Sequence, residues 1–136
     1  MAKRNHIFAE IEASNNFLSG ISTHVDWEPS TNIIAAGDGE KLIVEVELPG
    51  VNKEDVNILL EEDNHLIIRG IKRQPRLGDA KRATYYLFER EFGSFYKRIL
   101  IDFPLDASRI KSVMENGVLT VTIPRKKTEK ISVKVK

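Results

Sequence analysis

The chain has 136 residues, of which 41% are hydrophobic and 30% are charged. This suits one packed domain with extensions and argues against wholesale disorder. Lys and Arg number 21 against 20 Asp and Glu, a balance that argues against a dedicated nucleic-acid binder. The absence of Cys excludes disulfides and thiolate metal sites. The sequence holds neither an apolar run of the roughly 20 residues that span a membrane nor an apolar leader core, so we expect a cytoplasmic protein without a membrane partner.

The first 26 residues differ from the rest of the chain and are interpreted as an N-terminal arm. Their apolar side chains stand among Glu, Asn and Ser at spacings that suit a short amphipathic helix. Ser14 and Gly20 interrupt the pattern. We therefore predict an arm that is helical only in part, with these apolar residues available for contact: Phe8, Ile11, Phe17, Leu18 and Ile21.

From about residue 27 the hydrophobic period changes to two. Leu42, Val44 and Val46 alternate with polar residues, as expected of a strand with one buried face. The same pattern predicts further strands over residues 56–60, 66–71, 95–101, 108–115 and 119–123. Asn116-Gly117 is a strong hairpin signal because both residues tolerate positive φ. Several short strands with turns about every ten residues indicate an all-β antiparallel sandwich.

Residues 72–84 form a basic connection that is longer than usual. It leads into Tyr85-Tyr86-Leu87-Phe88, which is rich in residues that favour strands. A strand carried on a long loop can reach beyond its own sheet. We therefore expect it to pair with an exposed edge on another subunit.

The last twelve residues, 125–136, form a basic tail. They hold six basic residues and one acidic residue, so the tail carries +5 and the other 124 residues carry −4. Ile131, Val133 and Val135 alternate with polar residues. On these residues alone, an edge strand of the same domain is the favoured interpretation, and docking on another subunit is the alternative.

No catalytic or metal-binding pattern emerges from the sequence. The histidines His6, His24 and His65 stand apart from one another, whereas metal-binding motifs pair their ligands at short spacings. The acidic residues Glu61, Glu62 and Asp63 lie at a predicted turn, where solvation is expected. A hydrolase that uses Glu61, Glu62 or His65 is the disfavoured alternative. We expect no enzyme, no cofactor, no metal site and no nucleic-acid partner.

Four motifs, in this order, resemble those of the small heat-shock proteins, or α-crystallin-domain family. They are Leu48-Pro49-Gly50, Gly93-Ser94-Phe95, Asn116-Gly117-Val118-Leu119 and Ile131-Ser132-Val133. The resemblance covers residues 27–136. It implies an immunoglobulin-like β-sandwich over residues 27–124, with the arm before it and the tail after it. Lys97 stands where the family often has Arg, and a lysine lacks the planar group that gives an arginine its bidentate carboxylate contact.

The resemblance also implies roles for particular residues. The strand on the loop, within residues 72–90, would pair with a partner's strand near residues 31–36 to form a swapped dimer. The expected dimer-interface residues are Thr31, Ile33, Tyr85, Tyr86, Leu87, Phe88 and Glu89. The tail motif, Ile131 and Val133, would dock on a neighbouring dimer, which replaces the edge-strand interpretation. The expected docking groove consists of Val56, Ile58, Leu60, Ile110, Ser112 and Met114.

The function implied is that of an ATP-independent holdase chaperone. It would bind partly unfolded clients through the apolar residues of the arm, assemble into dimer-based homo-oligomers, and pass clients to ATP-dependent refolding chaperones. The alternative is a monomeric sandwich domain that acts as a co-chaperone adaptor.

Overall fold

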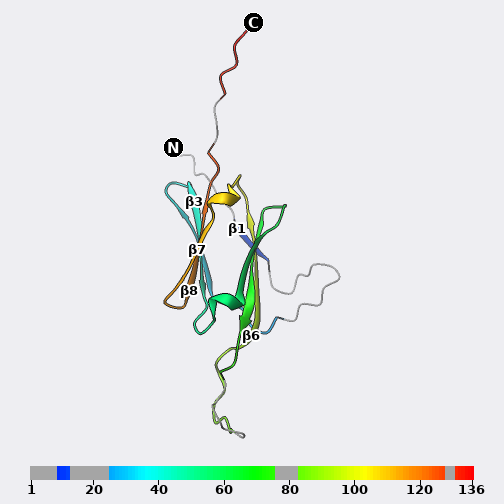
Figure 1. The fold of residues 1–136 in the computed structure, drawn as a ribbon, viewed down its shortest axis with the longest axis vertical. Helices are drawn as coiled ribbons and strands as arrows, with labels where there is room; N and C mark the ends of the chain where they lie inside the picture. Colours follow the sequence, from blue (N-terminus) through cyan, green and yellow to red (C-terminus); the bar gives the residue numbers. More distant parts are fainter. Residues whose placement is uncertain (1–8, 13–24, 76–82, 128–130) are drawn as a thin grey trace.

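The computed structural model describes residues 9–12, 25–75, 83–127 and 131–136. The strands within the first three ranges form two antiparallel sheets that face each other (Figure 1). The first sheet has the order β1-β6-β5-β4 and the second has the order β2-β3-β8-β7. The strands are β1 (Ala9–Glu12), β2 (Thr31–Ala36), β3 (Lys41–Glu47), β4 (Val56–Leu60), β5 (His65–Lys72), β6 (Gly93–Ile101), β7 (Lys111–Glu115) and β8 (Val118–Pro124). Two short 3₁₀ turns, η1 (Lys53–Asp55) and η2 (Ala107–Arg109), precede β4 and β7. The predicted all-β sandwich is confirmed.

The core fills the space between the two sheets, and the period of two explains which residues enter it. Strand β3 buries every second side chain, and its register sets Val44 opposite Val121 of β8. Strand β6 does the same with Phe95, Ile99 and Ile101. Burial of these branched and aromatic side chains is the main favourable term in the stability of the fold.

Two of the sequence motifs meet at one end of the sandwich. Gly117, at φ +73°, lies in the β7–β8 turn, and its carbonyl accepts a hydrogen bond from the Leu48 N–H (2.7 Å). A Cβ at Gly117 would lie 3.2 Å from the Cα of Pro49. A side chain at position 117 would therefore strain both the positive φ and the close contact with the Leu-Pro-Gly segment, which gives a physical reason for the two motifs to occur together.

The Gly93-Ser94-Phe95 motif begins β6 and is fixed by the segment before β2. Asp26 accepts hydrogen bonds from the Ser94 N–H (2.8 Å) and hydroxyl (3.1 Å). A Cβ at Gly93, whose φ is +103°, would lie 2.2 Å from the same carboxylate oxygen. Trp27 donates from Nε1 to the Gly93 carbonyl (3.0 Å) and packs edge-on against Phe95. The motif thus joins the start of the domain to a central strand.

The predicted helix of the N-terminal arm is wrong over Ala9–Glu12, because these residues form β1 beside β6. Ile11 lies opposite Ile99 in that register. Pairing with an open sheet edge satisfies the backbone of a four-residue segment that is too short for a stable helix of its own. The remainder of the arm lies outside the described residues.

The sandwich leaves four strand edges that no described strand covers, at β1 and β4 in one sheet and at β2 and β7 in the other. Edges of this kind present unpaired backbone groups to the surroundings. Among the described residues, no helix is long and apolar enough to cross a membrane.

Candidate functional site

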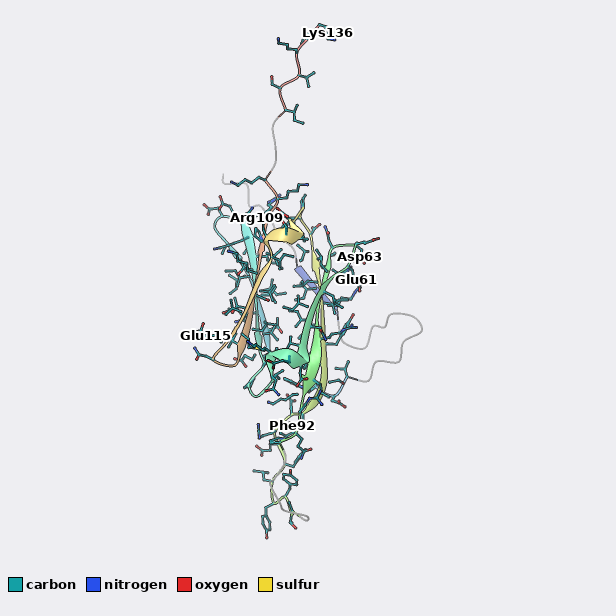
Figure 2. The ribbon with its side chains drawn as sticks, in the orientation of Figure 1. Glu61, Asp63, Phe92, Arg109, Glu115 and Lys136 are labelled. Atoms are coloured by element: carbon teal, nitrogen blue, oxygen red, sulfur yellow. The ribbon has the colours of Figure 1, made fainter. Side chains whose placement is uncertain are left out.

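The large exposed apolar side chains of the described residues gather on the loop before β6 and on the tail, with single ones on the edge strands β2, β4 and β7 and on β5. Figure 2 places Phe92 at the end of the sandwich from which the loop projects, and Lys136 far beyond the opposite end. No sheet of the same subunit covers either extension. These surfaces are the candidate functional site.

The loop segment Tyr85–Phe88 projects from the sandwich and is not paired as a strand. Tyr86 is 98% exposed and Leu87 is 73% exposed. The rings of Tyr85 and Phe88 pack edge to face, 5.2 Å apart, and Gln74 Nε2 donates a hydrogen bond to the Tyr85 hydroxyl (2.8 Å). The segment therefore contacts its own loop and forms no strand pairing with the described part of its subunit.

A ladder of alternating cations and aromatic rings anchors this loop to the sandwich. Lys72 Nζ lies 5.4 Å from the ring centre of Trp27 and 5.7 Å from that of Phe92. The Arg90 guanidinium carbon lies 4.9 Å from the ring centre of Phe92. Such contacts stabilise a cation most where water is excluded, and Lys72 is only 8% exposed. The ladder sets the direction in which the chain leaves the domain.

The side chains of Thr31 and Ile33, which are predicted for the dimer interface, contact their own subunit. Ile33 lies opposite the buried Val44, and its side chain packs against the subunit's own core. Thr31 is half-buried and donates its hydroxyl hydrogen to the Pro29 carbonyl (3.0 Å). What β2 offers a partner is its open edge. The predicted interface carboxylate, Glu89, is exposed on the loop and lines a hollow of about 300 Å³ with residues next to β2.

The six predicted groove residues all lie on the core-facing sides of the two edge strands β4 and β7 or next to them. Ile58 lies opposite the buried Ile68, and Ser112 lies opposite the buried Val121. Val56, Leu60, Ile110 and Met114 are half-buried and pack against the core, as does Ile58. Ser112 is exposed although it faces inward. Solvent therefore reaches between the two sheets along this edge, where apolar side chains are incompletely covered.

The tail, residues 131–136, forms no strand with its own sandwich and extends away from it (Figure 1). Its interpretation as an edge strand of the same domain is therefore wrong. Ile131 is 81% exposed and Val133 is 80% exposed. Both motif side chains are open to a partner.

Of the five residues predicted to contact clients, the structure describes the backbone of one. Ile11 lies in β1, opposite Ile99. The other four, Phe8, Phe17, Leu18 and Ile21, lie outside the described residues. The role of the arm therefore stays a prediction.

The acidic turn between β4 and β5 is not simply solvated, as the sequence had suggested. Arg98 of β6 reaches Glu61 (3.2 Å) and Asp63 (3.0 Å) with one guanidinium nitrogen. His65 Nδ1 lies 2.8 Å from Asp63. The hydrogen bond from His65 holds the pKa of the Asp63 carboxyl below its usual range, with the charge of Arg98 acting in the same direction. Sequence reasoning missed Arg98, which is distant in the chain and is brought here by the β5–β6 pairing.

The possible metal ligands of this turn already serve an ion-pair network. One ligand atom from each of Glu61, Asp63 and His65 lies within 4.8 Å of the others. The Arg98 guanidinium hydrogen-bonds both carboxylates and supplies the positive charge that they attract. Glu61, Asp63, His65 and Arg98 therefore form an ion-pair network that joins the β4–β5 turn to β6, which we call the Asp63 clamp.

Residues 35–136 match the sequence model of a protein family described as "Hsp20/alpha crystallin family". The small heat shock protein C2 of Rickettsia felis is 35% identical, over 98% of this chain and 88% of that protein. A 17.5 kDa class I heat shock protein of Glycine max is 31% identical, over 95% of this chain and 76% of that protein. The structure of heat shock protein 16.0 from Schizosaccharomyces pombe has a TM-score of 0.68 and 33% identity, covering 88% of this chain and 81% of that one.

A small heat-shock protein from Xylella fastidiosa has the same TM-score, 0.68, at 24% identity, and covers 82% of this chain and 99% of that one. At this identity the likeness concerns the fold alone. The matched region includes strands β3 to β8, the last two residues of β2 and the tail motif. The chain therefore belongs to the Hsp20/alpha crystallin family of small heat shock proteins, and membership of this family supports a chaperone role.

Proposed function

We propose that the protein is an ATP-independent holdase that binds partly unfolded proteins in the cytoplasm and prevents their aggregation without catalysing a reaction. The observation that supports the proposal is membership of the Hsp20/alpha crystallin family. The apolar side chains of the N-terminal arm are the surfaces we assign to clients, because those of the loop and the tail are used in assembly. Burial of apolar surface is non-directional, so such surfaces suit partners of many shapes. Clients held in this way would then pass to ATP-dependent refolding chaperones.

The dimer we propose forms by strand exchange. The segment Tyr85–Phe88 of one subunit pairs with the open edge of β2 in its partner, and the partner returns the same contact. Two features support this: the segment pairs with no described strand of its own subunit, and among the described strands β2 pairs only with β3. An isologous contact of this kind closes on itself and stops at two subunits.

Larger assemblies arise, in this proposal, when the tail of one dimer docks on another. Ile131 and Val133 would enter the groove between β4 and β7. Full burial of one branched apolar side chain is worth about 1.5–3 kcal/mol before ordering costs. One such contact is weak and reversible, whereas many in one assembly act together through their high effective concentration. The assembly can therefore be stable while its subunits exchange.

The test of client binding uses the full chain and a heat-labile enzyme whose aggregation is followed by light scattering without ATP. The triple variant Phe8→Ser, Phe17→Ser, Leu18→Ser should protect the client much less than the unaltered chain. The matched control, Asn15→Ser with Asn16→Ser, changes the same arm without removing apolar surface and should protect fully. Full protection by the triple variant, with its assembly intact, would remove the arm from the proposal.

The alternative function is that of a monomeric co-chaperone adaptor. The two proposals predict different masses for the protein in solution. Size-exclusion chromatography with light scattering should give an assembly larger than a dimer for the holdase. A monomer at all concentrations would favour the adaptor.

A further inference from the structure

A hollow at the root of the tail is lined mainly by cations, and we call it the tail-root hollow. Figure 2 shows one of them, Arg109, at the end of the sandwich from which the tail leaves. The hollow has a volume of about 440 Å³. Its lining residues are Glu40, Lys41, Arg109, Pro124, Arg125, Lys126 and Lys127. Five positive side chains thus face one acidic side chain within this lining.

Backbone hydrogen bonds hold the parts of this hollow in place. The Arg125 N–H donates to the Glu40 carbonyl (2.7 Å), and the Lys126 N–H donates to the Pro104 carbonyl (2.8 Å). Arg125 also forms a β-bridge with Leu105. The residue before β3, the segment before η2 and the root of the tail are therefore fixed relative to one another before any ligand arrives, which lowers the cost of binding.

The positive charge of the hollow is incompletely neutralised by the surrounding protein. Within the described part of the chain, no ion pair closer than 4.0 Å is formed by these five cations. Asp106 lies near Arg109 and Lys126 and offsets part of their charge, while it accepts hydrogen bonds from the N–H and hydroxyl of Ser108. The two acidic residues Glu40 and Asp106 and the five cations together give this region a net charge of +3. The net charge of the whole chain is only +1.

The chemistry of the lining favours phosphate groups. Arg and Lys together bind phosphate oxygens through charge-assisted hydrogen bonds. No aromatic side chain lines the hollow, so it lacks the stacking surface that single-stranded nucleic acids use. Its volume is far above the roughly 10–15 Å³ that one water molecule requires, which leaves room for several linked phosphates. We propose that the tail-root hollow binds a chain of phosphate groups, as found in inorganic polyphosphate.

A second copy of this chain is a poorer occupant. Its acidic β4–β5 turn is the obvious counterpart, but Glu61 and Asp63 already pair with Arg98 there. The proposed phosphate site is independent of the holdase function, since it requires neither strand exchange nor client binding.

The test is calorimetric titration of the full-length protein, in its assembled form, with inorganic tripolyphosphate at low ionic strength. We expect saturable binding that weakens as salt is added, because exposed charges are screened. The double variant Arg109→Gln, Arg125→Gln should bind about tenfold more weakly, since one exposed charge pair is worth up to about fivefold in affinity. The matched control, Lys53→Gln with Arg69→Gln, removes two exposed cations elsewhere and should retain the affinity.

Three outcomes would overturn the proposal. The first is an absence of saturable binding by the unaltered protein. The second is an equal loss of affinity in the control, which would mean that only overall charge matters. The third is tighter binding of a single-stranded RNA oligomer or of polyglutamate than of tripolyphosphate through Arg109 and Arg125, which would assign the hollow to another class of polyanion.

Discussion

At the scale of single residues, glycine is required where strands and turns approach too closely for a side chain. A Cβ at Gly70 would lie 2.2 Å from the Asp55 carbonyl oxygen and 2.7 Å from the Phe95 ring. Gly70→Ala should therefore lower the free energy of unfolding by about 1–3 kcal/mol, the usual cost of overpacking. Urea unfolding followed by Trp27 fluorescence, at fixed protein concentration, measures this. Arg69→Ala, on the exposed side of the same strand, should stay within about 0.5 kcal/mol of the unaltered chain, and equal losses in both would contradict the account.

The Asp63 clamp predicts a dependence of stability on pH. The pKa of Asp63 in the folded state lies below its unfolded value of about 3.9. The ionised carboxylate therefore stabilises the fold fully above the unfolded pKa, and this stabilisation is lost as pH falls through the folded pKa. Asp63→Asn should lower Tm at pH 5, and the difference from the unaltered chain should shrink on further acidification. Thermal unfolding across pH measures this. The control Glu62→Gln alters the exposed neighbouring charge and should shift Tm little. A Tm of Asp63→Asn that is lower than that of the unaltered chain by the same amount at all pH values would contradict the clamp.

For two lysines the sequence pattern predicts the inward orientation but not the partner. Lys72 and Lys97 stand at core-facing positions of β5 and β6, so strict alternation already places them inward. Their partners come from distant segments: Trp27 and Phe92 for Lys72, and Glu28, 2.9 Å away, for Lys97. The positions were predictable from the period of two. The partners required the three-dimensional pairing.

At the scale of elements, the proposed dimer depends on backbone hydrogen bonds from the loop segment. Tyr86→Pro removes one backbone donor at a side chain that is 98% exposed in the subunit. One hydrogen bond is worth about 0.5–1.5 kcal/mol, and the symmetric dimer loses two of them. Dimer affinity should therefore fall up to about a hundredfold, with steric hindrance adding to this. Concentration-dependent light scattering of the chain ending at Lys130 measures the dimer. Tyr86→Ala keeps the donor and should dimerise better than the proline variant; the opposite order would contradict strand exchange.

The elements differ in how far sequence reasoning could place them. Strands β3, β4, β5, β6 and β8 were predicted because each has a core-facing side and a bounding turn, and β7 was predicted as the hairpin partner of β8. The segment Ala9–Glu12 was assigned to a helix because four residues carry too little period to decide. Its state depends on the open edge of β6, which no local pattern reveals.

At the scale of the whole molecule, apolar docking and charge make separate contributions to assembly. The tail carries +5 and the remainder of the chain carries −4, a division that favours tails docking on neighbouring bodies. Exposed charge pairs are screened by salt, whereas the burial of Ile131 and Val133 is not. High salt should therefore reduce the assembled fraction only modestly. Sedimentation velocity across a salt series measures this, and complete dissociation at high salt would assign the assembly to charge.

The central claim is that the sandwich dimerises through its loop and that the tail joins dimers into larger assemblies. Native mass measurement on the full chain and on the chain ending at Lys130 tests it most directly. We expect a large homo-oligomer for the first and dimers or small species for the second, because Ile131 and Val133 are absent from the shortened chain. An unchanged large assembly after truncation would contradict tail docking, and a full-length monomer would contradict the account as a whole.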